Sequence, residues 1–162
     1  MTTLFIDADA CPVTREALAA ARKAGIPCVI AGNSTQNLQR HLRKSDSLEP
    51  RPGFWVSILQ VGIGADAADF AIVQELQPAD VVVTQDIGLA SMVLGRGAFA
   101  IGVRGRVYEK ATIDVQLFIR HEEKKVRRAG GRTGGPASFT DEDRQRFAEN
   151  LERLIARAKA AL

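Results

Sequence analysis

Three consecutive valines, Val81 to Val83, form the stretch that most constrains the fold of this chain. Asp80 and Thr84 flank them, so the apolar run is short and contains no polar alternate position. Such a run is typical of a strand in a parallel sheet that helices cover on both faces. The stretch therefore predicts an α/β fold with a buried central sheet.

The rest of the first 103 residues alternates short apolar runs with segments of helical period, which favours a mainly parallel sheet. Besides residues 80–84, strands are predicted over residues 3–7, 27–31, 56–61 and 99–103. Helices are predicted over residues 12–24, 38–44, 65–76 and 87–94. Pro12 in the first turn and Gly25 at the end delimit the first of these helices.

The pattern changes after Val103. Residues 111–128 have helical spacing, and we expect Ile113, Leu117 and Val126 on the inward face. Residues 129–138 hold four glycines and a proline, which predicts a mobile loop. Thr140 is a suitable N-cap for a last helix near residues 140–161. Its apolar stripe is formed by Phe147, Leu151, Leu154, Ile155 and Ala158. We expect one domain over residues 1–162.

Composition excludes several classes of protein. The apolar and charged fractions, 46% and 25%, are those of an ordinary globular domain, and no apolar run approaches the roughly 20 residues that span a bilayer. The N-terminal stretch lacks the basic region of a signal peptide, so we expect a cytoplasmic protein without membrane partners. Cys11 and Cys28 suggest no disulfide framework, and the two histidines lack zinc-ligand spacing.

The net charge of +3 is concentrated in two basic clusters, which either neutralise phosphates or form solvated helix faces. The first cluster comprises Arg40, Arg43, Lys44 and Arg51. The second comprises Arg120, Lys124, Lys125, Arg127, Arg128 and Arg132.

Acidic and polar side chains follow four of the predicted strands, where ligands bind in parallel α/β sheets. In chain order they are Asp7, Asp9, Asn33, Asp66, Asp69, Thr84 and Asp86. Asp9, Asp66 and Asp86 each have the alternative role of a helix cap, and Asn33 that of an Asx-turn residue. Caps do not explain the whole set, because Asp7 and Asp9 cannot both cap one helix. Carboxylates gathered in this way suit Mg²⁺ or Mn²⁺.

Three enzyme classes compete for this carboxylate set. A phosphatase with an aspartyl nucleophile is suggested by D-x-D after the first strand, but its later lysine and acidic pair lack counterparts. Dinucleotide binding is suggested by G-x-G-x-x-A over residues 62–67, but Asp66 and Asp69 would repel a pyrophosphate there. A metal-dependent nuclease requires acidic residues at several strand ends and basic surface outside the pocket, and the sequence offers both.

Four stretches of the chain, "FIDADACPV", "GADAADFAIV", "VVVTQDIGLA" and "GGPASFTDEDRQRF", resemble the YaiI/YqxD family of bacterial proteins of unassigned function. That family is related to PIN-like and NYN ribonuclease domains. The resemblance implies a three-layer α/β/α fold with a mainly parallel sheet, plus C-terminal helices. It also implies that Asp7, Asp66 or Asp69, and Thr84-x-Asp86 match acidic positions that bind Mg²⁺ or Mn²⁺ in those nucleases.

We therefore expect a divalent-metal-dependent nuclease that acts on RNA rather than DNA. Asp7 and Asp86 are the expected central ligands, and Asp66 and Asp69 complete the site. Asp9 is an outer ligand, the group that orients water, or the helix cap. The residues expected to contact substrate are Asn33, Thr84, Arg104 and Arg106.

Two alternatives to the nuclease stay open at this point, a non-catalytic nucleic-acid-binding module and a metal-dependent phosphatase. Cys11 lacks the spacing of a phosphatase nucleophile and is expected to pack as a small side chain. Phe54 and Trp55 are assigned to the core rather than to base stacking.

Overall fold

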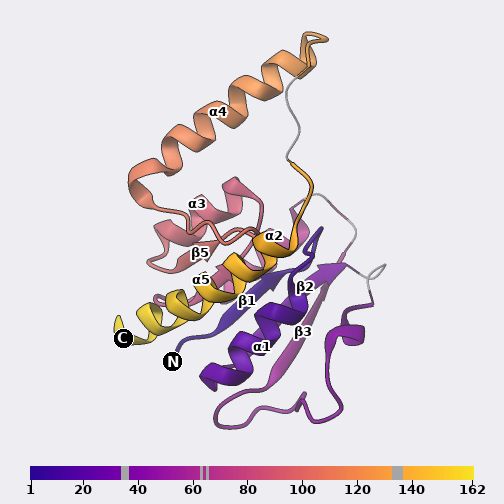
Figure 1. Ribbon diagram of the computed structural model, residues 1–162, viewed down its shortest axis with the longest axis vertical. Coiled ribbons are helices and arrows are strands. Elements are labelled where there is room, and N and C mark those ends of the chain that lie inside the picture. Colours follow the sequence, from indigo (N-terminus) through magenta and orange to yellow (C-terminus); the bar gives the residue numbers. More distant parts are fainter. Residues whose placement is uncertain (34–36, 63, 65, 133–136) are drawn as a thin grey trace.

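The computed structural model describes residues 1–33, 37–62, 64, 66–132 and 137–162. In this part of the chain one all-parallel sheet has the strand order β3-β2-β1-β4-β5 (Figure 1). The strands are β1 (Leu4–Asp7), β2 (Cys28–Asn33), β3 (Val56–Val61), β4 (Val81–Val83) and β5 (Phe99–Ile101). The parallel α/β sheet predicted from the sequence is confirmed.

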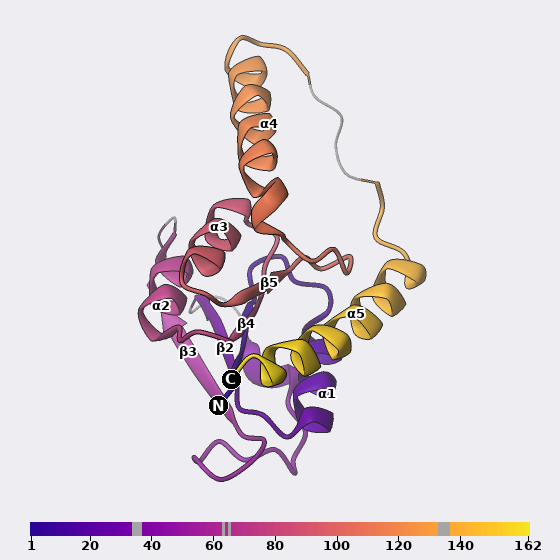
Figure 2. The same cartoon turned by 90° about the vertical axis from the view of Figure 1, so that its left-hand side faces the viewer.

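Helices cover both faces of the sheet, as the predicted three-layer α/β/α architecture requires. They are α1 (Thr14–Ala24), α2 (Ala67–Glu75), α3 (Ile87–Gly95), α4 (Lys110–Arg128) and α5 (Asp141–Ala160), with a short 3₁₀ helix at Leu38–His41. Core residues of α1 and α5 pack together on one face, and those of α2, α3 and the start of α4 pack on the other. Figure 2 shows α1 and α5 on one side of the strands and α2 and α3 on the other.

Strand β1 lies at the centre of the sheet and supplies both core layers. Leu4 and Ile6 are fully buried with α1 and α5, whereas Phe5 is buried with α2 and α3. Leu4 is in register with Cys28 of β2 and with Val81 of β4. The three valines of β4 are fully buried, which confirms a strand covered on both faces.

Local sequence signals account for several element ends. Gly25 ends α1 in the left-handed conformation at φ 66°, where its N–H contacts the carbonyls of Ala21 and Arg22. Thr140 begins α5 with a capping box, in which Thr140 and Asp143 exchange side-chain and backbone hydrogen bonds. The predicted Thr140 cap is thus confirmed, and so is the buried apolar stripe of α5.

The predicted inward face of α4 is wrong at its C-terminal end. Ile113 is buried and Leu117 packs against the core, but Val126 is 43% exposed. The reason is the direction of the helix, since α4 projects away from the sheet in both views (Figures 1 and 2). The predicted helix over residues 38–44 is shorter, because only Leu38–His41 form the 3₁₀ turn.

Two of the predicted segments lie partly outside the described residues. The middle of the predicted Gly-rich loop, residues 133–136, lies outside the described residues, as do residues 63 and 65 of the G-x-G-x-x-A match. Among the helices that are described, none combines the length and apolar character needed to cross a bilayer.

Gly105 allows the connection from β5 to α4 to lie directly against α5. It has a φ of +91°, and a Cβ there would come within 2.9 Å of the backbone of Arg146 and Phe147. We expect Gly105→Ala to lower the free energy of unfolding by about 2 kcal/mol or more, because both the left-handed conformation and the close packing disfavour a side chain. Urea denaturation followed by circular dichroism measures this change.

Gly97→Ala is the matched control for that prediction. Gly97 also has a positive φ, +79°, but its Cβ would come no closer than 3.7 Å to Pro78. Gly97→Ala should therefore lose less stability than Gly105→Ala. Equal losses in the two variants would show that the close approach to α5 contributes nothing.

Candidate functional site

A cavity of about 540 Å³ lies at the carboxyl edge of the parallel sheet, the edge where ligands of such sheets bind. Segments from every part of the sheet except β5 contribute to its walls. The polar side chains that line it are Asp7, Asp9, Asn33, Asp66, Asp69, Gln85, Asp86 and Arg120. We call it the acidic cavity.

Asp7 is the buried anchor of the acidic cavity. It ends β1 at 7% exposure, and the Thr84 hydroxyl donates to its Oδ2 over 2.8 Å. The N–H of Asp9 contacts the other oxygen, Oδ1, at 3.4 Å. Burial raises the pKa of Asp7, while the hydrogen bonds from Thr84 and Asp9 oppose that increase. Thr84 thus positions Asp7.

Asp86 both caps α3 and pairs with an arginine of α4. Its Oδ1 caps α3 by accepting from the N–H groups of Gly88 at 2.8 Å and Leu89 at 3.3 Å, which confirms the cap role. Arg120 of α4 donates to the same oxygen at 3.1 Å. Burial raises the pKa of Asp86, but the hydrogen bonds from Leu89 and Gly88 and the Arg120 guanidinium outweigh it, so the pKa lies below its usual value.

Asp69 has a strongly raised pKa. It lies in the first turn of α2 and is 9% exposed. Burial, followed by the charges of Asp86 and Asp7, a hydrogen bond with the Asp86 side chain and the charge of Asp66, raises its pKa to about 7. Burial and the repulsion among these carboxylates therefore leave Asp69 about half protonated at neutral pH when no cation is bound.

Of the cap roles considered for the other two aspartates, that of Asp9 is wrong, and that of Asp66 is right in position but not in side-chain hydrogen bonding. The N-cap of α1 is Val13 rather than Asp9, because a turn containing Ala10 at φ 50° separates Asp9 from the helix. Asp66 occupies the N-cap position of α2, but at φ 68° its side chain accepts no capping hydrogen bond. Both carboxylates therefore line the cavity, and neither accepts a capping hydrogen bond from a helix.

Three of the aspartates meet closely enough to share a cation. Asp66, Asp69 and Asp86 each offer an oxygen within 4.8 Å of the others. Asp7 lines the same cavity but is not a member of this group of three. A donor set made only of carboxylate oxygens fits Mg²⁺ or Mn²⁺, and a cation there would relieve the repulsion that raises the pKa of Asp69.

The two arginines predicted to contact substrate do not line the acidic cavity. Arg104 donates to Asp143 at 2.8 Å and to the Ala137 carbonyl, both beside the start of α5. Arg106 lies against the Gln116 amide. Thr84 is buried and does not line the cavity either, whereas Asn33 does, and its contact with substrate stays a prediction.

Two of the three residues assigned to packing behave as expected, whereas Trp55 is only half-buried and belongs to neither core cluster. Phe54 is buried in the core, with the Arg22 guanidinium over its ring at 5.4 Å. Cys11 packs against the same core, and burial raises the pKa of its thiol, which keeps the thiol protonated at neutral pH.

Two residues of the site are not predicted by the sequence patterns. Arg120 lines the cavity and pairs with Asp86, whereas its sequence context assigns it only to a basic cluster. The signal that could have found it is its position seven residues after Ile113, on the inward face of α4, where an arginine needs a carboxylate partner. Tyr108 donates from its hydroxyl to the Thr84 carbonyl at 3.2 Å, and no motif marks it.

Comparisons with known proteins place the chain in a family. The model described as "Uncharacterized BCR, YaiI/YqxD family" matches residues 5–157. UPF0178 proteins of Vibrio vulnificus and Clostridium acetobutylicum are each 39% identical over 158 residues, which is 96% of this chain and 98% of theirs. A UPF0178 protein of Xanthomonas campestris is 40% identical over 162 residues, which is 99% of this chain and 94% of that protein. No solved structure gives a significant match. The chain therefore belongs to the YaiI/YqxD family of bacterial proteins.

Proposed function

We propose that the chain is a divalent-metal-dependent nuclease that hydrolyses phosphodiester bonds, with RNA preferred to DNA. The observation that carries this proposal is the meeting of Asp66, Asp69 and Asp86 within 4.8 Å, on the rim of a cavity that Asp7 also lines. Such carboxylate sets hold divalent ions in enzymes that transfer or hydrolyse phosphate groups. The preference for RNA follows from the resemblance to PIN-like and NYN ribonuclease domains.

Some residues of the site would bind the cation, and others would contact the substrate or the attacking water. Asp66, Asp69 and Asp86 would hold Mg²⁺ or Mn²⁺, which supplies the Lewis acidity for attack on the phosphorus. Asp7, which Thr84 positions, adds a fourth carboxylate to the same cavity. Asp9 is exposed at the cavity and is suitably placed to orient the attacking water. Asn33 is positioned to contact substrate.

A specific observation favours a second candidate, a non-catalytic module that binds nucleic acid. The Arg120 guanidinium already neutralises Asp86 at 3.1 Å, so a cationic side chain lies beside the proposed metal position. If that ion pair persists, the carboxylates serve to order α3 and α4 rather than to hold a metal.

Metal binding tests the cluster directly. We expect Asp69→Asn to weaken Mn²⁺ binding at least tenfold, because one of three carboxylate ligands is lost. Isothermal titration calorimetry measures the affinity. Asp114→Asn is the control, since Asp114 is an exposed carboxylate on α4 that does not line the cavity. An unchanged affinity in Asp69→Asn would contradict the assignment.

The pKa of Asp69 predicts how metal affinity depends on pH. Because its pKa is raised to about 7, Asp69 must release a proton before it binds a cation. The apparent affinity should fall about tenfold for each unit of pH below 7 and level off above it. In Asp69→Asn this dependence should flatten. A wild-type affinity that stays constant between pH 5 and 8 would argue against Asp69 as a ligand.

Cleavage assays test the activity itself. We expect Asp86→Asn to abolish Mn²⁺-dependent cleavage of single-stranded RNA, a loss of about a hundredfold or more. Asparagine is also a good N-cap, so α3 should stay intact, which circular dichroism and thermal denaturation check. The Asp114→Asn variant should cleave like the wild type.

Other outcomes of the same assay identify the alternatives. A wild-type protein that cuts neither RNA nor DNA with Mg²⁺ or Mn²⁺, but binds RNA with a steep salt dependence, is the binding module. Hydrolysis of a generic phosphomonoester that is lost in Asp7→Asn identifies a metal-dependent phosphatase instead.

A further inference from the structure

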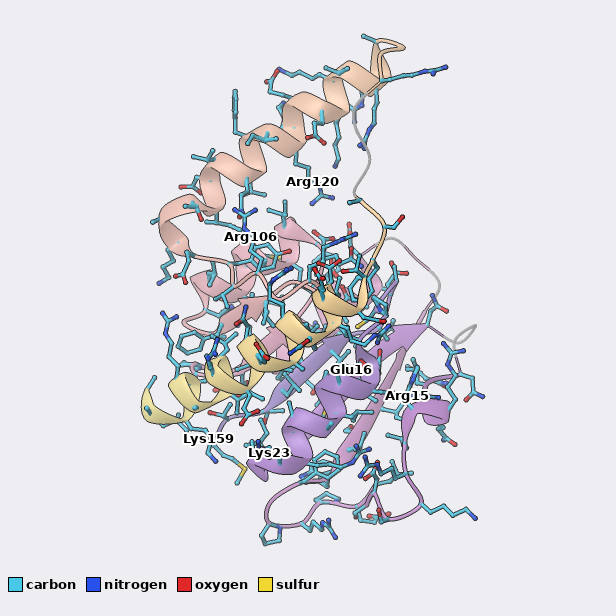
Figure 3. The ribbon with its side chains drawn as sticks, in the orientation of Figure 1. Arg15, Glu16, Lys23, Arg106, Arg120 and Lys159 are labelled. Atoms are coloured by element: carbon cyan, nitrogen blue, oxygen red, sulfur yellow. The ribbon has the colours of Figure 1, made fainter. Side chains whose placement is uncertain are left out.

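A second groove lies between α5 and the connection that leads from β5 to α4. Its volume is about 640 Å³, and five arginines line it, which is why we call it the arginine groove. They are Arg104, Arg106, Arg146, Arg153 and Arg157. Figures 1 and 2 both show the connection running beside α5, and Figure 3 shows Arg106 near the base of α4.

Three of these arginines form one face of α5. Arg146, Arg153 and Arg157, with Asn150 between them, follow one another at spacings of four, three and four residues. Residues at such spacings share a side of a helix. At 1.5 Å of rise per residue, Arg146 and Arg157 lie about 16 Å apart along the axis. Since a stacked strand places a phosphate about every 3.4 Å along its axis, this face is long enough for about five phosphates.

The groove has more positive charge than its own carboxylates neutralise. Arg104 and Arg146 share one carboxylate, Asp143, at 2.8 and 3.0 Å. Arg157 is 3.8 Å from Glu109, which is too long for a hydrogen bond.

The remaining two arginines face neutral partners. Arg153 donates to the Asn150 amide, and Arg106 lies against the Gln116 amide. Among the described residues, no carboxylate pairs with Arg106 or Arg153. A solvated helix face usually alternates charges of both signs, so this excess favours an anionic ligand.

The two walls of the groove are fastened to each other. The Asn150 amide donates to the Gly105 carbonyl at 2.7 Å, and Gly105 lies directly on the backbone of α5. The Arg157 guanidinium lies over the Phe99 ring of β5 at 5.2 Å. The groove is thus formed before any ligand arrives, which reduces the entropy lost on binding.

A third cavity lies between the arginine groove and the acidic cavity. It shares Ala10 and Gln85 with the acidic cavity and Arg104 with the arginine groove. Phe139 lines it, and the Arg104 guanidinium lies 5.7 Å from the centre of that ring. The three hollows therefore adjoin one another between the carboxylates and α5.

The acidic cavity on its own is a poor place to hold a nucleic acid. Its carboxylates repel phosphates, so a polyanionic substrate needs compensating positive charge nearby. Guanidinium groups match phosphate oxygens in geometry as well as in charge. The arginine groove supplies such groups, and a third cavity that borders it also borders the acidic cavity.

We propose that the arginine groove binds the sugar–phosphate backbone of a single-stranded nucleic acid, next to the nucleotide that enters the acidic cavity. The part concerning the acidic cavity rests on the proposed nuclease function. Binding of the sugar–phosphate backbone by α5 does not rest on that function, because the arginine groove has its own charge and shape.

The test is RNA binding by the double variant Arg153→Gln/Arg157→Gln. Fluorescence anisotropy with a labelled 20-nucleotide oligo(U), in EDTA and over a range of salt concentrations, measures the affinity. We expect an affinity at least tenfold lower than that of the wild type. The slope of log affinity against log salt should fall by about 0.7 for each phosphate that the variant no longer neutralises.

The matched control is Lys23→Gln/Lys159→Gln, which removes the same charge. These lysines lie together at the end of α1 and α5 that is remote from Arg120 (Figure 3). Lys23 pairs with Glu152, and Lys159 donates to the Ala24 carbonyl. This variant should bind RNA within about twofold of the wild type if the effect depends on position rather than net charge.

Three results would overturn the proposal. The first is equal loss of affinity in the two double variants. The second is tighter binding of a duplex of the same length than of the single strand, and the third is equal binding of poly-glutamate, which would indicate an acidic protein. Because the assay runs in EDTA, it is independent of cleavage. A wild type that cuts nothing refutes the nuclease but leaves this test intact.

Discussion

The hydrogen bond from Thr84 to the buried carboxylate of Asp7 is the interaction on which the rest of the site depends. A carboxylate buried at a strand end is costly unless a hydrogen-bond donor faces it. The hydroxyl of Thr84, the residue that follows the neighbouring strand β4, donates to Asp7 over 2.8 Å. The same hydroxyl accepts from the N–H of Asp86 at 3.0 Å, which places Asp86 at the start of α3. Tyr108 then ties the Thr84 carbonyl to the connection before α4.

Charges of opposite sign are separated on the surface in a way that suits a polyanionic substrate. The acidic cavity gathers carboxylates, and burial together with their charges raises the pKa of Asp69 to about 7. On α5 and beside it, guanidinium groups gather that Asp143 and Glu109 only partly neutralise. Only Arg120 brings positive charge into the acidic cavity, among the described residues that line it. A cation entering the cavity therefore competes with a guanidinium that is already held at Asp86.

The sheet and the meeting of its aspartates could be predicted because both follow from local pattern. Val81 to Val83 indicate a strand buried on both faces, and parallel strands bring the residues after β1, β3 and β4 to one edge. What could not be predicted depends on the direction of helices in space. Arg120 reaches Asp86 because the first turns of α4 pack beside α3, and Val126 is exposed because α4 then projects away from the sheet.

The distance along the chain between the parts of the site has a consequence for the order in which it forms. Asp7 and Thr84 are 77 residues apart, and β1 pairs directly with β4. Closing so long a segment is entropically unfavourable until strand pairing compensates, which is a feature of slow-folding parallel sheets. During synthesis the acidic cavity therefore cannot assemble until β4 and α3 have emerged, and the arginine face of α5 follows only some 60 residues later. A nascent chain thus acquires its carboxylates well before the surface that would hold a polyanion against them.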